Sequence, residues 1–291
     1  MPEGKFRTGG KKERLDVLLV GAGIASSREK ARRIIMAGEI FVNGMPEIKP
    51  GTFVKPNSEI IFKPLKGEKA FVSRGGKKLD KAFQVFEISV ENKVAMDIGA
   101  STGGFTDCLL RRGAKRVYAI DVGYGQLAWE LQENPKVIVL DRTNIRYLSP
   151  DVIPEPVDFA TVDVSFISVK KFMEHLLTFL KDDGELIVLI KPQFEAGRDK
   201  VQKGGVVSNA RVHAVTIKAI LEFMEGLGVE IRGLTYSPIT GPAGNIEFLV
   251  YAVKNEAADL EFYSVQAISQ VVQAAHRELG DALSMQGDSR K

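Results

Sequence analysis

The stretch Val94-Ala-Met-Asp-Ile-Gly-Ala-Ser-Thr-Gly-Gly-Phe-Thr106 decides the fold. It begins with the pattern of a buried strand that stops at the acid Asp97, and glycines at positions 99, 103 and 104 then lead into a predicted helix. Glycine has no Cβ, so backbone N–H groups in such a turn can approach a ligand closely. Open α/β folds bind ligands at the carboxyl edge of the sheet, so the turn predicts a site for a nucleotide-like cofactor. The same glycines would also suit an ordinary tight turn.

The spacing of the glycines differs from that of a dinucleotide-binding turn. A G-x-G-x-x-G turn seats a pyrophosphate on a helix N-terminus, whereas this one is D-x-G-x-x-x-G-G, with Asp97 in the turn. A carboxylate would repel a pyrophosphate, but it suits the cationic and amino groups of S-adenosylmethionine. We therefore predict that this turn binds S-adenosylmethionine. The residues assigned to it are Asp97, Gly99, Ala100, Ser101, Thr102, Gly103, Gly104 and Phe105.

Three further predicted strands each end in an aspartate, at Asp121, Asp141 and Asp163. Asp121 lies 22 residues after Gly99, about the interval at which Rossmann-like folds present a carboxylate to ribose hydroxyls. The ends of parallel strands open onto one edge, so we expect these acids and Asp97 to share a site. Asp121 and the adjacent Val122 are assigned to the ribose, Asp141 to the adenine amino group, and Asp163 to the cofactor as well.

The composition indicates a two-domain intracellular protein. The chain has 291 residues, 44% of them apolar, which is enough for cores of ordinary size. Cys108 is the only cysteine, which excludes a disulfide framework and favours a buried thiol. No apolar run approaches the roughly 18 residues that span a bilayer, and no hydrophobic region follows the basic N-terminus. We expect a cytoplasmic protein that stays off the membrane and, with three widely spaced histidines, has no metal site.

The positive charge is concentrated at the N-terminus. Residues 1–70 carry 14 Lys and Arg against 8 Asp and Glu, a net charge of +6, whereas the remainder carries 26 against 29, a net charge of −3. Such an excess indicates a polyanionic partner, although a solubilising surface would produce the same composition. The charge alone leaves both readings open.

The pattern of residues 12–63 favours the polyanionic partner. After a flexible basic tail at 1–11, residues 14–20 predict a short amphipathic helix, and Ser26-Ser-Arg-Glu29 is a capping box for a second helix that carries arginines on one side. An Asn43-Gly44 turn and β segments near 54 and 60–62 follow.

This order resembles the S-four-type RNA-binding module, on the motifs R-L-D-x-L-L, S-S-R-E-K-A-R-R-I-I-M-A-G and F-V-N-G. The resemblance implies that the arginine-bearing helix contacts RNA phosphates and that 64–70 is a linker to a domain at 71–291. The sequence itself predicts a disordered tail after about residue 284. The residues expected to bind RNA are Arg14, Arg28, Lys30, Arg32, Arg33, Arg74 and Lys77.

Two lysines and two acids form a possible catalytic group. Lys191 follows the apolar strand 186–190 at the edge that carries Asp163, while Glu247 lies on a late strand and Lys78 precedes the sheet. A lysine at a strand end is usually a solvated charge. In a group of this kind, however, like-charge repulsion and burial could lower the pKa of one ammonium, so that the amine takes or shares the proton of a hydroxyl nucleophile.

The whole chain resembles the TlyA family, on these four residues and the motifs S-R-G-G-K-K-L, D-I-G-A-S-T-G-G-F-T, D-V-S-F-I-S, K-P-Q-F-E and N-I-E. The resemblance implies an α/β fold, with a Rossmann-like, FtsJ-like methyltransferase sheet after the small α+β module. It also implies a catalytic Lys-Asp-Lys-Glu tetrad, with S-adenosylmethionine as donor and cytidine 2′-hydroxyls of ribosomal RNA or ribosomal subunits as acceptors. S-R-G-x-x-K-L favours Lys78 over Lys77 in the tetrad.

The resulting hypothesis is a metal-free, in-line methyl transfer in which Lys191 accepts the proton of the 2′-hydroxyl. Lys78 and Glu247 would orient Lys191 and the substrate, and Asp163 would hold the lysine near the methyl group. Two other classes stay open: a non-catalytic RNA-binding or ribosome-binding factor, and a membrane-lytic protein, since family members are often called hemolysins. The sequence does not indicate the methylated nucleotide, the subunit or the oligomeric state.

Overall fold

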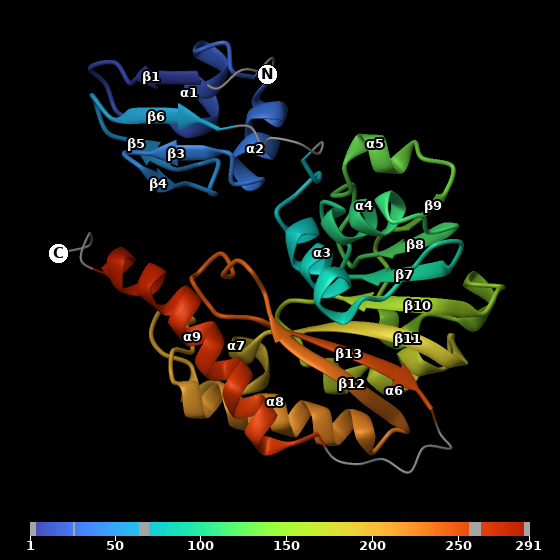
Figure 1. Cartoon of the computed structure of the whole chain (residues 1–291). Helices are drawn as coiled ribbons and strands as arrows, with labels where there is room; N and C mark the ends of the chain where they lie inside the picture. Colours follow the sequence, from blue (N-terminus) through green and yellow to red (C-terminus); the bar gives the residue numbers. More distant parts are fainter. Residues whose placement is uncertain (1–3, 26, 64–69, 256–262, 288–291) are drawn as a thin grey trace. The chain divides into compact units, whose positions relative to one another are not determined.

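The computed structural model describes residues 4–25, 27–63, 70–255 and 263–287 (Figure 1). The chain forms two compact units, Met1–Gly76 and Lys77–Lys291, and each is described by itself. The boundary falls within helix α3, Gly75–Phe86.

The first unit is a small α+β domain. Its main sheet has the order β1-β6-β3-β4, and β2 pairs with β5 beside it. Ala31, Ile34 and Ile35 on α2 are buried together with Leu15 and Leu19 of α1. Asn43 and Gly44 both have positive φ, which gives the two-residue hairpin predicted between β3 and β4. The elements are β1 Gly4–Arg7, β2 Glu13–Arg14, α1 Leu15–Gly21, α2 Arg28–Met36, β3 Ile40–Val42, β4 Met45–Pro46, β5 Phe53–Val54 and β6 Glu59–Phe62.

Two local predictions for this unit were wrong. Residues 4–7, expected in a flexible tail, form strand β1 along the edge of β6, and the hydroxyl of the buried Thr8 donates to the Lys55 carbonyl at 2.8 Å. This pairing is non-local, so the polar, basic sequence of the strand does not reveal it. The second wrong prediction is the cap of α2, because the capping box Ser26-Ser-Arg-Glu29 places it at Ser26. The N-cap is Ser27, whose hydroxyl accepts from the Lys30 N–H at 3.2 Å. Ser26 and residues 64–69 of the expected linker lie outside the described residues.

The second unit is built on a seven-stranded sheet with the order β12-β13-β11-β10-β7-β8-β9 (Figure 1). Five neighbouring strands are parallel, in the order β9, β8, β7, β10 and β11. Beyond them, β13 pairs antiparallel with β11, and β12 pairs antiparallel with β13. The carboxyl ends of five neighbouring strands therefore share one edge. The strands are β7 Val94–Ile98, β8 Arg116–Ile120, β9 Val137–Leu140, β10 Val157–Val162, β11 Leu180–Ile190, β12 Val229–Tyr236 and β13 Phe248–Lys254.

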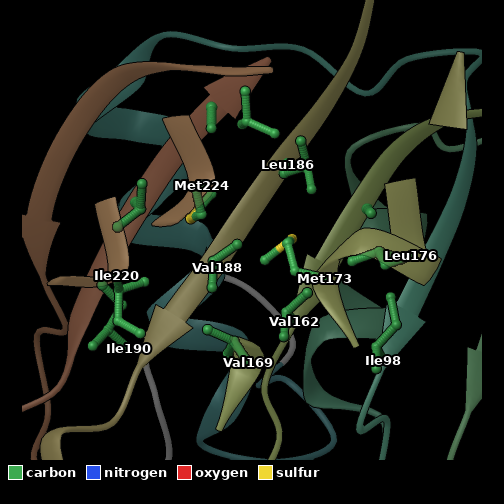
Figure 2. Close-up of a cluster of buried hydrophobic side chains, with 14 of the residues drawn as sticks. Ile98, Val162, Val169, Met173, Leu176, Leu186, Val188, Ile190, Ile220 and Met224 are labelled. Atoms are coloured by element: carbon green, nitrogen blue, oxygen red, sulfur yellow. The ribbon is translucent and has the colours of Figure 1, made fainter. Parts of the chain in front are cut away.

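Helices cover both faces of this sheet. On one face, Val162, Val188 and Ile190 of the strands pack with Met173 of α6 and with side chains of α8, as Figure 2 shows. On the other face, α3 stacks Phe83 on Phe159 of β10 and Phe86 on Tyr251 of β13. The helices are α4 Gly104–Arg111, α5 Trp129–Gln132, α6 Met173–Leu177, α7 Pro192–Glu195, α8 Ala210–Glu225 and α9 Val265–Gly287, with short 3-10 turns η1 Ile145–Tyr147, η2 Pro150–Val152, η3 Val169–Lys171 and η4 Arg198–Lys200.

Some boundaries differ from the prediction. β11 begins at Leu180, six residues before the apolar run 186–190, because Leu180 already pairs with Val157 of β10. Residues 181–184 interrupt the register before Glu185 pairs with Phe159. Helix α9 runs to Gly287, so residues 285–287 of the tail that was expected to be disordered are helical. Within α9, Ile268, Val272 and Ala275 are buried, whereas Val265 in its first turn is 62% exposed.

Candidate active site

The glycine turn packs directly against the end of β10. Gly99 has φ +85°, and a Cβ at this position would lie 2.5 Å from the carbonyl oxygen of Asp163. The Asp163 N–H in turn donates to the Ile98 carbonyl at 2.9 Å. Gly103 has φ +92°, and a Cβ at this position would lie 2.2 Å from Cδ1 of Leu131. Both glycines are therefore required by packing, and the first of them brings the turn to the predicted catalytic aspartate.

Asp97 lies within β7, inside the fold, rather than in the turn itself. Its side chain is fully buried, and its two carboxylate oxygens accept from the hydroxyls of Thr106 at 2.7 Å and Thr161 at 3.0 Å. Burial raises the pKa of Asp97 to about 7, although the two threonine hydrogen bonds oppose the shift. The Asp97 side chain therefore connects β7, just before the turn, to α4 and β10.

Asp121 and Asp141 lie together at the edge, as predicted. One Asp121 oxygen accepts from the Ser101 N–H at 2.8 Å and the other from the Gly123 N–H at 2.7 Å. Asp141 accepts from the Gly125 N–H at 2.7 Å. Each carboxylate oxygen has more than one acceptor site, so both acids can still accept from hydroxyl or amino groups of a ligand. Val122 beside them is 70% exposed.

The two lysines and two acids of the predicted tetrad form a line of ion pairs. Lys191 Nζ lies 2.6 Å from Asp163 Oδ1, and Lys78 Nζ lies 3.9 Å from Asp163 Oδ2 and 2.6 Å from Glu247 Oε2. The side chains of Lys78, Lys191 and Glu247 are 7%, 10% and 1% exposed. A buried lysine needs such partners, which explains why the four residues occur together.

Lys78, rather than Lys77, makes this pair with Glu247. It lies in the first turn of α3, a helix that the sequence did not predict, and α3 buries Lys78 together with Leu79, Ala82 and Phe83. Of the two lysines, Lys78 is therefore the one that is buried beside Glu247. Gly241, which precedes β13, leaves room for the pair, because a Cβ there would lie 2.6 Å from Glu247 Oε1.

Sequence reasoning missed a set of contacts that joins the loop after β10 to α7. Lys191 Nζ donates to the Ser165 hydroxyl at 2.9 Å, and the rings of Phe166 and Phe194 lie 5.0 Å apart. Glu195 accepts from the Ser168 hydroxyl at 2.5 Å and from the Val169 N–H at 2.8 Å. The two segments carry the motifs D-V-S-F-I-S and K-P-Q-F-E. The presence of these two motifs was the only sign in the sequence that the segments belong to one site.

The arginines of the first unit are partly engaged within the protein. Asp16 is completely buried and accepts from Arg14 at 2.9 and 3.0 Å and from Arg28 at 2.9 Å. These guanidinium groups hold the pKa of Asp16 far below its ordinary value. Both arginines stay partly exposed, at 41% and 59%, and Arg32 is exposed as well. Arg14 and Arg28 therefore have a structural role besides any contact with RNA.

Similarity to known proteins agrees with this geometry. Residues 71–254 match the FtsJ-like methyltransferase family, and residues 13–60 match the S4 domain. A 16S/23S rRNA (cytidine-2′-O)-methyltransferase TlyA of Mycobacterium tuberculosis is 42% identical, over 83% of this chain and 90% of its own. The chain belongs to the TlyA family of FtsJ-like methyltransferases.

Other TlyA relatives carry different names. Hemolysin A of Brachyspira hyodysenteriae is 40% identical, over 82% of this chain and 99% of its own. A solved Streptococcus thermophilus structure with a provisional hemolysin name is 39% identical, with a TM-score of 0.74, and covers 95% of this chain and all of its own. In the described part of this TlyA-family chain, no helix is long and apolar enough to cross a bilayer. The described residues also contain no group of three or more His, Cys, Asp or Glu side chains that could hold a metal ion.

Proposed function

We propose that the protein transfers the methyl group of S-adenosylmethionine to a cytidine 2′-hydroxyl of ribosomal RNA. The observation that carries the proposal is the continuous contact between two parts of one sheet edge. Gly99 of the glycine turn packs on the Asp163 backbone, and the Asp163 side chain holds Lys191 at 2.6 Å. A methyl donor bound in the turn would thus lie next to a nearly buried lysine. The cytidine acceptor is proposed from the names of the relatives.

The strand-end acids fit this cofactor. Asp121 and Asp141 are held by backbone N–H groups and keep acceptor capacity for ribose hydroxyls and for an adenine amino group. The turn at 99–104 would hold the methionine end, with Asp97 fixing the turn rather than touching the ligand. When bound, S-adenosylmethionine supplies an electrophilic methyl group on a sulfonium ion.

The tetrad supplies alignment and a proton acceptor. Asp163 and the Lys78–Glu247 pair hold Lys191 at the sheet edge, where its amine, in the neutral form, receives the proton that the 2′-hydroxyl loses. Holding the hydroxyl in line with the methyl group contributes as well, because positioning two bound reactants is itself a large rate effect.

The S4 domain would supply affinity for RNA. Its arginines at 28, 32 and 33 lie on one helix within a segment of net positive charge, which suits the phosphate backbone. We expect the substrate to be ribosomal RNA or a ribosomal subunit in the cytoplasm, where bacterial ribosomes assemble.

The decisive experiment incubates the purified protein with labelled S-adenosylmethionine and ribosomal RNA from cells that lack the gene. Mass spectrometry should then locate new 2′-O-methyl marks on cytidine. Calorimetry should show S-adenosylmethionine binding that Asp121→Ala weakens by roughly 1–3 kcal/mol, because charge-assisted hydrogen bonds are lost. Asp151→Ala, at an exposed carboxylate on η2, is the control. Cofactor binding without any methyl transfer to RNA would favour the non-catalytic RNA-binding factor.

A further inference from the structure

The loop after β10 presents one hydroxyl to Lys191. Lys191 is only 10% exposed, and its ammonium donates to the hydroxyl oxygen of Ser165 at 2.9 Å while it contacts Asp163 at 2.6 Å. Ser165, in contrast, is exposed to solvent. A substrate approaching the sheet edge can therefore reach the Ser165 hydroxyl more readily than the lysine nitrogen behind it.

The position of Ser165 is fixed from both sides. Before it, the Asp163 backbone is bonded to β7 through Ile98. After it, Phe166 adopts φ +66°, an uncommon value for a bulky residue, and Glu195 accepts two hydrogen bonds from Ser168 and Val169. Strained backbone held by its surroundings is typical of functional sites. The loop thus holds a small hydroxyl, rather than a mobile side chain, in front of Lys191.

We propose that Ser165 is a further catalytic residue, which relays the proton of the substrate 2′-hydroxyl to Lys191. The inference rests on the proposed function. With Lys191 in the neutral form, the Ser165 hydroxyl donates to the amine nitrogen and accepts from the 2′-hydroxyl. As the bond between O2′ and the methyl carbon forms and the carbon–sulfur bond breaks, the 2′-proton passes to Ser165 Oγ. The original Ser165 proton passes to Lys191, and a neutral thioether leaves. Lys191 ends as an ammonium beside Asp163 and returns its proton to water.

Single-turnover methylation with labelled S-adenosylmethionine and unmodified ribosomal RNA tests the relay. Ser165→Ala should lower the rate by about 10²–10⁴-fold, the contribution typical of acid–base catalysis, while binding of both substrates is unchanged. Ser165→Thr keeps the hydroxyl and should keep most of the rate. Ser269→Ala, which removes a hydroxyl that accepts from Gln273 within α9, should behave as wild type.

A proton inventory separates a relay from a structural effect. In mixtures of H₂O and D₂O, the rates of the wild type and Ser165→Thr should curve with deuterium content, because two protons move together. The residual rate of Ser165→Ala should depend on it linearly. A wild-type rate in Ser165→Ala, or a slower rate with an unchanged inventory, would overturn the relay and leave the methyltransferase proposal intact. A wild-type protein that transfers no methyl group to RNA would overturn both.

Discussion

At the scale of single residues, the four strand-end acids separate into two kinds. The sequence places Asp97, Asp121, Asp141 and Asp163 at one sheet edge, and they lie there. It does not show that Asp97 points inward, because its two partners, Thr106 and Thr161, come from α4 and β10. A carboxylate at a strand end can either contact a ligand or hydrogen-bond to neighbouring elements inside the fold. Only the packing of the neighbouring elements decides between them.

The buried position of Asp97 predicts a pH-dependent stability. Its pKa of about 7 lies above the ordinary value of 3.8, so the stability contributed by the protonated form is complete below about pH 4 and is lost as the pH rises through 7. Relative to Asp97→Asn, the wild type should lose roughly 2–4 kcal/mol of unfolding free energy between pH 4.5 and 8. Urea unfolding followed by the fluorescence of Trp129, the single tryptophan, measures this in the second unit. Parallel pH curves for the two proteins would refute the assignment.

The proposed role of Lys191 predicts that charge alone is insufficient. Lys191→Arg keeps a positive charge, but a guanidinium stays protonated and cannot accept the proton of the 2′-hydroxyl. Single-turnover methylation should therefore fall at least about 100-fold, with cofactor and RNA binding retained. Lys181→Arg is a matched control, because Lys181 lies at the opposite end of β11 and pairs with Asp158. Near-normal methylation by Lys191→Arg would leave Lys191 a purely electrostatic role.

At the scale of elements, sequence patterns predict the parallel strands and the two helices α1 and α2, but they do not predict α3 or β1. Helix α3 opens with Gly75 and Gly76, which disfavour a helix locally. It forms because Leu79, Ala82 and Phe83 bury against the sheet, and Gly76 allows close contact with Phe71, whose Cγ would lie 2.3 Å from a Cβ. Because local sequence does not predict α3, the motif S-R-G-x-x-K-L is the only sequence feature that favours Lys78 over Lys77. Tertiary packing overrides propensity at such positions.

The close packing of the turn after β7 against β10 predicts that adding one methyl group at Gly99 lowers the unfolding free energy. Gly99→Ala adds a Cβ at φ +85° and 2.5 Å from the Asp163 carbonyl, so either the turn or β10 must move. We expect a loss of roughly 2–4 kcal/mol in unfolding free energy, together with reduced methyl transfer. Gly205→Ala has a similar φ of +79° but open space around its Cβ, and should cost only about 1 kcal/mol. Equal losses in the two variants would show that the contact with Asp163 is unimportant.

At the scale of the whole molecule, the charge distribution along the sequence already indicates a division of labour between the two units. Under the proposed function, the basic excess of residues 1–70 would supply RNA affinity, and the strand-end acids of the second unit would serve cofactor binding and chemistry. What the charge pattern hides is that some of these cations stabilise their own domain. Arg28 pairs with the buried Asp16, whereas Arg32, four residues later on α2, is exposed and has no ion pair among the described residues.

Because only Arg28 pairs with a buried acid, we expect substitutions of Arg28 and Arg32 to differ in their effect on stability. Arg32→Ala should reduce the salt dependence of RNA binding by a slope of about 1, because one phosphate contact is lost, without changing stability. Arg28→Ala should reduce that slope and also lower the unfolding temperature, because the buried Asp16 loses one of its cationic partners.

RNA affinity measured between low and moderate salt, together with thermal unfolding of each variant, separates the two effects. S-adenosylmethionine binding should be the same in both variants, since neither residue belongs to the methyltransferase unit. A wild-type salt slope in Arg32→Ala would mean that RNA binds to another face of this domain. A wild-type unfolding temperature in Arg28→Ala would mean that Arg14 alone suffices for Asp16, because its two hydrogen bonds already occupy both carboxylate oxygens.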